Sequence, residues 1–389
     1  MSGALSHIKV VDLAVARAGP SCVRILSDLG ASVIQVVRPA GGGGDIGLPG
    51  ADRENLHRNK RSIALDLQQQ AGHDVFMKLI HDADVVVENF RPDVKHRLGL
   101  DYEPLSTINP RLVYGSISGF GQDGPWGPRP GVDQIAQGLG GLMSISGEPG
   151  TGPWRVGIAI CDLAAGMYLA HAIMAALIER EKSGQGQWVK TSLLESVIAL
   201  LDFQAARWLL DGEVAGQAGN DHPTMFPTGV FPTSDGMINI AATGDRAFNN
   251  FSNVIGLPDL ASDERFANVR SRGRNREPLR ELCEAQTRKF TSEELVEKLN
   301  EAGVPSGPIL SIDQVFANSQ VQHLGMAAPI DSDRGALNLV RPGFQLSRTP
   351  AQVRSAAPTA GEHTREVLAE LGLEASDIEA LASAGVIPA

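Results

Sequence analysis

The chain opens with a strand–helix–strand pattern at residues 8–37, IKVVDLAVARAGPSCVRILSDLGASVIQVV. Residues 8–13 and 32–37 are apolar, β-branched runs of strand length. The helix expected over 21–29 follows a Gly-Pro turn and stops at Gly30. Two strands joined by one helix form a βαβ unit, which requires parallel strands and a right-handed crossover. This stretch therefore predicts a parallel sheet.

The same alternation continues to residue 210. We expect further strands at 62–67, 85–88, 112–118 and 187–192, and helices at 70–82, after Asp162 as far as Gly184, and at 193–210. Strands that alternate with helices predict an α/β fold with a doubly wound parallel sheet. Arg38, Asn89 and Gly119 each follow a strand, so we expect them at the ligand crevice beyond the carboxyl ends of the strands.

The composition changes at residue 211, where Gly, Pro, Thr and His become frequent. We expect a large domain at 1–210, a linker at 211–225, a smaller α+β domain at 226–325, a return linker at 326–360, and a helix at 361–389 that docks back on the large domain. The smaller domain should contain a strand at 238–242 and helices near 246–256, 276–290 and 292–302. The large domain is then built from both ends of the chain.

Composition excludes several classes of partner. The net charge of −11 argues against nucleic acid and anionic membranes, and only 5% of residues are aromatic. The N-terminus lacks the features of a signal peptide, and the best membrane-span candidate, 163–178, is short. Cys22, Cys161 and Cys283 are widely spaced, so we expect no disulfide framework, no metal site and a reducing cytoplasm.

Asp162 precedes a run without a full charge that lasts until Glu179 and is apolar on all sides, which is typical of a buried helix. At the positive end of that helix, a carboxylate is favoured in its ionised form. Asp162 is then either an N-cap or a carboxylate nucleophile, with Gly166 leaving room beside it one turn further on. Cys161 is expected to be a small buried residue, because nothing nearby would lower its pKa.

Basic residues indicate an anionic ligand. Clusters at 58–61 and 89–97 in an acidic chain favour a phosphate or diphosphate, and Arg38 lies where an Arg can meet a phosphorylated ribose. That ribose belongs to NADP or to coenzyme A (CoA). The glycine run at 41–45 is not a P-loop, and the turn after the first strand lacks G-x-G-x-x-G, so we expect no nicotinamide cofactor.

Short motifs occur in order along nearly the whole chain: VDLAVARAGP at 11–20, LSDLGASVI at 26–34, NKRSIALD at 59–66, ENFRP at 88–92, GFGQDGP at 119–125, RVG at 155–157, Asp162, SGQGQ at 183–187 and GEHTREVLAELG at 361–372. Each motif is weak alone, but the ordered set resembles the class III CoA-transferase family. That family includes formyl-CoA and carnitine CoA-transferases and the α-methylacyl-CoA racemases. The resemblance implies an interlaced homodimer in which two chains thread through each other.

The resemblance also assigns roles to residues. Asp162 matches the acyl-accepting nucleophile of the transferases. The residues that match the family's CoA pocket are Arg17, Ala18, Arg38, Lys60, Arg61, Asn89, Phe90, Arg91 and Arg97. We therefore expect an enzyme that moves CoA from an acyl-CoA to a small carboxylic acid through an anhydride and a thioester on Asp162.

Two departures from the family narrow this reading. The triplet Gly131-Val132-Asp133 carries Val where the racemases have His, so two-base racemisation loses one of its bases. The Tyr found at that position in formyl-CoA transferases, and their glycine tetrad, are also missing, and residues 222–227 read HPTMFP instead. Specificity for oxalate or formate is therefore not implied.

Three alternatives stay open. One is an acyl-CoA racemase of the same family that uses another base. The second is an NADP-dependent oxidoreductase, which would explain Arg38 but lacks a pyrophosphate loop. The third is a non-catalytic CoA-binding protein in which Asp162 only caps a helix. For a transferase, Arg129, Arg155 and His222 are candidates to meet a second carboxylate, and the glycine-rich segments 138–152 and 219–229 are candidates to close the site against water.

Overall fold

The computed structural model describes residues 3–39 and 50–389, and the chain divides into two compact units. The first unit comprises Met1–Leu142, Arg155–Ala206 and Gln320–Ala389, and the second comprises Met143–Trp154 and Arg207–Ser319. The glycine run at 41–45 lies outside the described residues. The second unit is larger than the 226–325 expected from composition. It gains 143–154 because the Gln217 side chain donates a hydrogen bond to the Ser146 carbonyl (2.7 Å).

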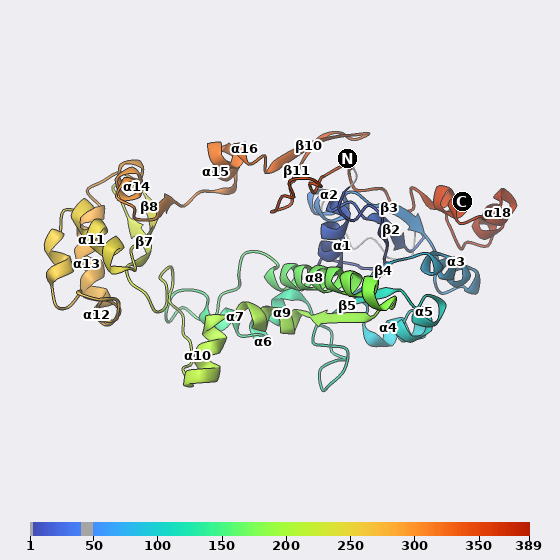
Figure 1. Ribbon diagram of the computed structural model, residues 1–389, viewed down its shortest axis with the longest axis horizontal. Helices are drawn as coiled ribbons and strands as arrows, with labels where there is room; N and C mark the ends of the chain where they lie inside the picture. Colours follow the sequence, from blue (N-terminus) through green and yellow to red (C-terminus); the bar gives the residue numbers. More distant parts are fainter. Residues whose placement is uncertain (1–2, 40–49) are drawn as a thin grey trace. The chain divides into compact units, whose positions relative to one another are not determined.

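A six-stranded parallel sheet, in the order β3-β2-β1-β4-β5-β6, forms the centre of the first unit (Figure 1). The strands are β1 (Lys9–Asp12), β2 (Ser32–Val37), β3 (Arg61–Ala64), β4 (Val85–Glu88), β5 (Val113–Ser118) and β6 (Trp188–Ser192). Every pair in this sheet is parallel, which confirms the predicted doubly wound sheet. The strand order reverses between β1 and β4, where sheets of this kind open a ligand crevice.

Strand residues alternate between two hydrophobic cores, one on each face. Val10, Val85 and Val87 face the core that includes helices α1 (Ala18–Asp28) and α8 (Ile160–Ser183). Val11 and Val86 face the other core, which is covered by α3 (Gln70–His81), α5 (Tyr102–Ile108), α17 (Thr364–Glu370) and α18 (Ala375–Ser383). Both ends of the chain therefore build one domain around one sheet. The C-terminal segment forms two helices where one was expected, with Gly372 between them at a φ of 81°.

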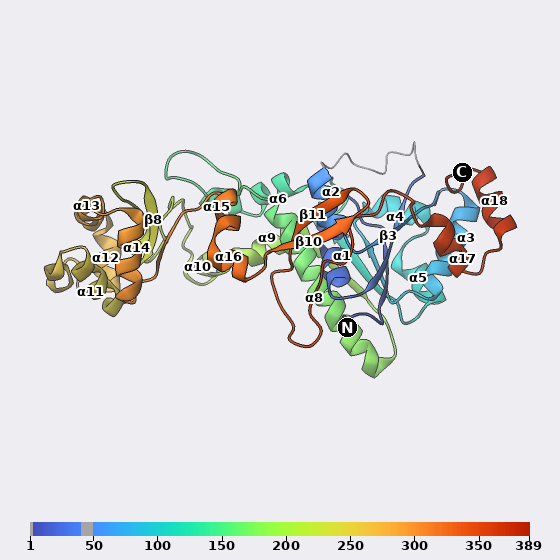
Figure 2. The ribbon, with the colours of Figure 1, turned by 90° about the horizontal axis from the view of Figure 1, so that it is seen from above.

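Helices α1 and α8 lie side by side in both views (Figures 1 and 2). Gly166 makes this approach possible, because a Cβ there would lie 2.8 Å from the Ala18 carbonyl oxygen and 3.0 Å from the Cys22 nitrogen. The space that we expected beside Asp162 is therefore filled by the α1 backbone, and that part of the prediction is wrong. Helix α8 is long and apolar enough to cross a membrane by length and composition, and half of that stretch is buried here, as in the core helix of a globular domain.

The remaining elements of the first unit connect these layers. They are α2 (Gly50–His57), α4 (Pro92–Leu98), α6 (Asp133–Leu139), α7 (Leu142–Ile145), α9 (Leu193–Leu200), α10 (Phe203–Asp211) and the hairpin β10 (Ala327–Ser332) to β11 (Gly335–Val340). Helices α7 and α10 run on into the second unit. The single helix expected over 193–210 is broken at Asp202, whose φ is 46°. The hairpin lies where we expected only a return linker.

The second unit has a three-stranded antiparallel sheet of β7 (Thr228–Pro232), β8 (Met237–Ala241) and β9 (Ser306–Pro308). Its helices are α11 (Asp245–Val254), η1 (Pro258–Ser262), α12 (Val269–Arg274), α13 (Arg276–Thr287), α14 (Ser292–Glu301) and α15 (Ile312–Ala317); α16 (Ser319–His323) begins where the unit ends. Buried aromatic side chains, Phe226, Phe231, Phe248 and Phe251, form much of its core. The unit therefore combines an antiparallel sheet with helices.

Candidate active site

Asp162 is the third residue of α8, and the N-cap position is occupied by Ala159, which makes no side-chain cap. The interpretation of Asp162 as an N-cap is therefore wrong. Its carboxylate is partly exposed and accepts no hydrogen bond from any residue that the structure describes. A carboxylate at the positive end of a helix, without a structural partner, is available to a substrate.

Two charged residues act on Asp162. Burial, together with the negative charge of Asp133, raises the pKa of Asp162 to about 6, while Arg17 acts in the opposite direction. The carboxyl group is then ionised for the most part at neutral pH but holds its proton more tightly than an ordinary Asp does.

Cys161, the neighbour of Asp162, is buried. Burial and the nearby Asp133 raise the pKa of its thiol to about 12, so the thiolate is scarce at neutral pH. This confirms the expectation that Cys161 packs as a small apolar residue.

The loop between β1 and α1 connects Asp162 with a cavity. The Asn89 side chain makes two hydrogen bonds with the Val15 backbone, donating to its carbonyl and accepting from its N–H, both at 2.8 Å. Ala16 takes a φ of 59°, and Arg17, the N-cap of α1, pairs with Asp52 at 2.6 Å. Val15 and Ala16 line the cavity, whereas the next residue, Arg17, lies within electrostatic reach of Asp162.

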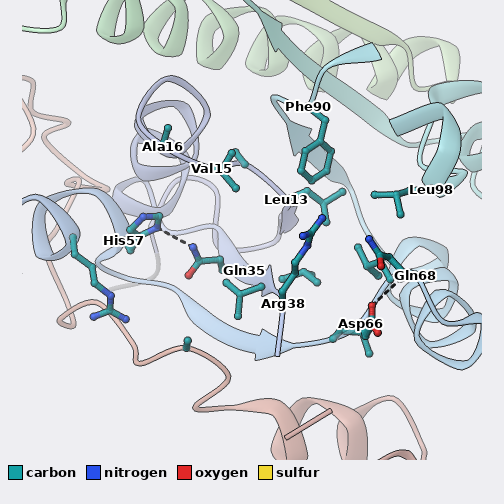
Figure 3. A pocket seen from close by; sticks show the side chains of 17 residues that line it. Leu13, Val15, Ala16, Gln35, Arg38, His57, Asp66, Gln68, Phe90 and Leu98 are labelled. Atoms are coloured by element: carbon teal, nitrogen blue, oxygen red, sulfur yellow. Dashed lines mark hydrogen bonds between the residues drawn. The ribbon is translucent and has the colours of Figure 1, made fainter. Parts of the chain in front are cut away.

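The cavity lies beyond the carboxyl ends of β1, β2 and β3 and has a volume of about 290 Å³ (Figure 3). Its wall is largely apolar, with Leu13, Val36, Leu65, Phe90 and Leu98, and Arg38 and Arg53 add positive charge. Small-molecule pockets span roughly 300–1,000 Å³, so this one holds a fragment of a large ligand. It lies where doubly wound sheets bind nucleotides.

His57 in the cavity wall is neutral. Its Nδ1 lies 3.1 Å from the Gln35 amide nitrogen and 3.2 Å from Lys60 Nζ. Burial and the charges of Lys60 and Arg53 lower its pKa to about 2. The positive charge of the cavity therefore comes from the arginines.

The residues predicted to bind CoA fall into two groups. Arg38 and Phe90 line the cavity, Asn89 supports its loop, and Arg17 and Ala18 follow directly in sequence. Arg97 lines a neighbouring groove that shares Leu67, Gln68 and Leu98 with the cavity.

The remaining three are engaged elsewhere. Lys60 forms a fully buried ion pair with Asp12 at 2.8 Å, so its ammonium group serves the core rather than a ligand. Arg61 pairs with Glu366 and Glu370, and the exposed Arg91 lies 3.3 Å from Asp93.

Sequence reasoning missed several residues of the cavity wall, among them Gln35, Arg53, His57, Leu65 and Leu98. Gln35 offered a signal, because a polar residue inside a β-branched strand often faces a ligand or partner. The helix that carries Arg53 and His57 gave no such signal.

The three cations considered for a second carboxylate differ in their surroundings. The half-exposed Arg155 lies 3.5 Å from Asp133, beside the site. Arg129 stacks on the Trp126 ring at 4.9 Å. His222 Nδ1 accepts from the Thr224 and Met225 backbone N–H groups. The two glycine-rich segments meet, because Gly219 donates to the Gly147 carbonyl at 3.0 Å.

Comparison with known proteins identifies the family to which the chain belongs. A family model described as CoA-transferase family III matches residues 5–364. The succinate–glutarate CoA-transferase of Agrobacterium fabrum is 39% identical over 381 residues, covering 94% of this chain and 95% of that protein. The succinyl-CoA–D-citramalate CoA-transferase of Chloroflexus aurantiacus is 34% identical and covers 98% of each chain. The crystal structure of a CAIB/BAIF family protein from Brucella suis superposes with a TM-score of 0.84 at 37% identity, over 95% of this chain and 100% of that one.

Fold and relatives together define an α/β transferase. The chain belongs to CoA-transferase family III, and it is an enzyme that transfers CoA between an acyl-CoA and an acid. The resemblance seen in the sequence motifs is thereby confirmed, and the oxidoreductase and the non-catalytic binding protein are set aside.

Proposed function

We propose that Asp162 is the nucleophile of this CoA-transferase and that its acids are dicarboxylic. One observation carries the first part: the Asp162 carboxylate is partly exposed and has no hydrogen-bond donor among the described residues. It also lies at the positive end of α8 and within electrostatic reach of Arg17, and Ala16, the residue before Arg17, lines the cavity.

The first half-reaction makes an acylated enzyme. An Asp162 oxygen attacks the thioester carbonyl, the C–S bond breaks, and CoA leaves as a thiolate while a mixed anhydride forms. The thiolate then attacks the aspartyl carbonyl, which releases the donor acid as a carboxylate and leaves an aspartyl-CoA thioester. One difficult exchange is thus divided into easier covalent steps.

The second half-reaction runs these steps in reverse with the acceptor acid. Its carboxylate attacks the aspartyl thioester, CoA thiolate leaves, and the thiolate then attacks the acceptor's acyl carbon, which regenerates Asp162. The backbone N–H of Asp162 has no partner among the described residues, so it can donate to an oxyanion. No step requires net proton transfer.

We assign the nucleotide part of CoA to the cavity. Its apolar wall suits an adenine ring, and Arg38, with Arg97 in the adjoining groove, suits the phosphates. Replacing Arg38 by Ala should raise the KM for acyl-CoA about tenfold or more with little change in kcat, because it removes a contact made equally before and during the reaction.

The chemical class of the donor and acceptor acids is inferred from the relatives. Their names include succinate, glutarate and D-citramalate, all of them dicarboxylic acids. Succinyl-CoA should therefore be tested as donor against a panel of dicarboxylic and monocarboxylic acids by mass spectrometry. Faster transfer to monocarboxylic acids would contradict the assignment.

The nucleophile is tested by trapping. After incubation with succinyl-CoA, hydroxylamine or borohydride should modify the peptide that contains Asp162, and Asp162→Ala should lose both the label and turnover. Asp377→Ala is the matched control, because Asp377 is also the third residue of a helix, α18, but is exposed and does not line the cavity. Label on another residue, or normal turnover in Asp162→Ala, would rule out this role.

We also propose that the chain works as an interlocked homodimer. Leu209 and Leu210 on α10 are 78% and 83% exposed, and Trp208 beside them is 56% exposed. Adjacent exposed side chains of this size favour burial against another chain.

A further inference from the structure

Asp133, the first residue of α6, is buried and reaches the start of α8. Its Oδ1 accepts a hydrogen bond from the Cys161 N–H at 2.9 Å. Its Oδ2 accepts from the Gln137 amide at 2.7 Å and lies 3.5 Å from the Arg155 guanidinium. One carboxylate therefore joins α6, α8 and the segment before α8.

Gln137, one turn further along α6, is fully buried and completes this contact. Its Oε1 accepts from the Val156 N–H at 2.9 Å, and its amide nitrogen donates to the Ile158 carbonyl at 3.3 Å. The two side chains of α6 thus hold the backbone from Val156 to Cys161.

Helix α8 needs this support because it has no cap of its own. Ala159 at the N-cap has no side-chain acceptor, and the first N–H groups of a helix have no partner inside the helix. Asp133 supplies the acceptor from another element, which is the role that an N-cap Asp normally plays locally.

A glycine pair places α6 at this position. A Cβ added to Gly119 would lie 2.6 Å from the Gly131 Cα, and one added to Gly131 would lie 2.6 Å from the Gly119 Cα. The loop after β5 therefore closes on itself backbone to backbone, and it delivers Asp133 to the start of α8.

We propose that Asp133 is a positioning residue for Asp162: it fixes the first turn of α8 through the Cys161 N–H, and its negative charge makes the neighbouring Asp162 carboxylate a stronger nucleophile. This inference rests on the proposed role of Asp162. The charge effect agrees with the raised pKa of Asp162, to which Asp133 contributes after burial. Nucleophilicity increases with pKa, as thiolates show.

The charged and titratable groups around Asp162 come from three elements. Asp133 acts from α6, Arg17 acts from the start of α1, and the neutral Cys161 thiol is next to Asp162 in sequence on α8. Arg17 is in turn paired with Asp52 of α2, and Arg155 faces Asp133. Removal of the Asp133 charge leaves the favourable effect of Arg17, so the pKa of Asp162 should fall.

Asp133→Asn removes the charge and keeps an acceptor for the Cys161 N–H, but it loses the hydrogen bond from the Gln137 amide, so it is compared with Gln137→Met, which loses that bond and keeps the charge. For succinyl-CoA as donor, we expect the acid limb of the kcat/KM profile to move to lower pH by about one unit. The rate of aspartyl adduct formation at pH 8 should fall about threefold, because nucleophilicity changes by a little under half a log unit for each unit of pKa. Asp133→Ala, which also loses the cap, should lose more activity. Asp123→Asn, in the exposed loop that ends at Gly131, is the control and should match the unmodified enzyme.

Gln137→Met tests the geometric part without changing a charge. It should lower kcat while the acid limb stays in place, and it keeps the proposal testable if Asp133→Asn fails to fold. An unchanged pH profile of kcat/KM and an unchanged rate of adduct formation in a folded Asp133→Asn would overturn the proposed charge effect. An unchanged kcat in both Gln137→Met and Asp133→Ala would overturn the proposed positioning of the first turn of α8. If trapping labels a residue other than Asp162, the proposed function itself fails; if Asp162 is labelled and these variants behave normally, only the present inference fails.

Discussion

Asp162, the proposed nucleophile, is a carboxylate that the fold does not stabilise. Its carboxylate lies in a partly buried place beside Asp133, it accepts no hydrogen bond from the described residues, and its pKa is raised to about 6. The Glu370 carboxylate, in contrast, has a partner in Arg61 that lowers its pKa. A group held ready for a substrate therefore lowers the stability of the free enzyme.

The effect of Asp162 on stability should depend on pH. Because its pKa is higher in the folded chain, the folded state binds the proton more tightly, and the free energy of unfolding falls as pH rises from about 4 to about 6. Asp162→Asn removes this effect, so at pH 8 it should raise the free energy of unfolding by about 1–3 kcal/mol. The favourable interaction between the carboxylate and the helix dipole, which the variant also loses, reduces this gain. At pH 4 the two proteins should differ little. Denaturation with urea at both pH values measures this, and a less stable Asp162→Asn at pH 8 would contradict it.

Removal of the Lys60 charge should destabilise the fold, in contrast to removal of the Asp162 charge. The ion pair of Lys60 with Asp12 is fully buried, and Asp12 also accepts from the Ala14 N–H at 2.9 Å. Lys60→Met leaves the Asp12 charge buried and unpaired, which should destabilise the chain by about 3–5 kcal/mol. Thermal unfolding checks this, and the double variant Asp12→Asn with Lys60→Met should recover part of the loss. A stable Lys60→Met with weakened CoA binding would instead restore the ligand role that the family resemblance implies.

At the scale of elements, the contact between α1 and α8 sets the position of the site. Helix α1 carries Arg17 at its start, α8 carries Asp162, and Gly166 allows the two backbones to touch. The glycine therefore acts on helix packing and not on the substrate. The distance between the proposed nucleophile and the cavity loop is controlled by this helix pair.

Gly166→Ala should disturb that pair. The added methyl group would meet backbone atoms of Ala18 and Cys22, which cannot move away as a flexible side chain would, so we expect a loss of about 1–3 kcal/mol and lower activity. Gly50→Ala, on α2, is the matched control, because no atom of the described residues lies within 4 Å of a Cβ there, and it should be neutral or slightly stabilising. Thermal unfolding of both variants measures the difference, and equal stability would contradict the packing argument.

At the scale of the whole molecule, both ends of the chain build the first unit. Val367 and Leu368 of α17 join the core on one face of the sheet, and Thr364 Oγ1 accepts from the Ala64 N–H at the edge strand β3 (3.0 Å). The C-terminal helices therefore cover a face that would otherwise expose the β3 edge and its apolar residues. In contrast, Leu209 and Leu210 stay exposed on the single chain.

The proposed homodimer predicts the effect of charge at these leucines. The double variant Leu209→Glu with Leu210→Glu should shift the protein towards a monomer and reduce activity, because burying two carboxylates at an interface is unfavourable. Ile108→Glu, at the end of α5 and 40% exposed, is the control and should leave the assembly unchanged. Sedimentation velocity measures the outcome, and a double variant with an unchanged mass in solution would contradict the use of this surface.

Local patterns were sufficient for part of this result. The six parallel strands, the buried helix after Asp162 and the inert Cys161 all follow from alternation, helical periodicity and neighbouring residues, since these depend on contacts near in sequence. The same reasoning missed the hairpin of β10 and β11, the break between α9 and α10 at Asp202, and the packing of Gly166 against the backbone of α1. Each of these depends on what the segment meets in the folded chain.

The sequence by itself determined the fold class, the family and the identity of the proposed nucleophile, because ordered motifs and hydrophobic periods are properties of the chain. Only the tertiary structure decided which of the predicted residues line one cavity. It also showed that Lys60 forms an ion pair with Asp12, and that Asp133 accepts a hydrogen bond from Cys161, 28 positions later, at the start of the helix that carries Asp162. The physical reason is that charge pairing, burial and capping are set by distances between atoms, and these contacts join residues far apart in the chain.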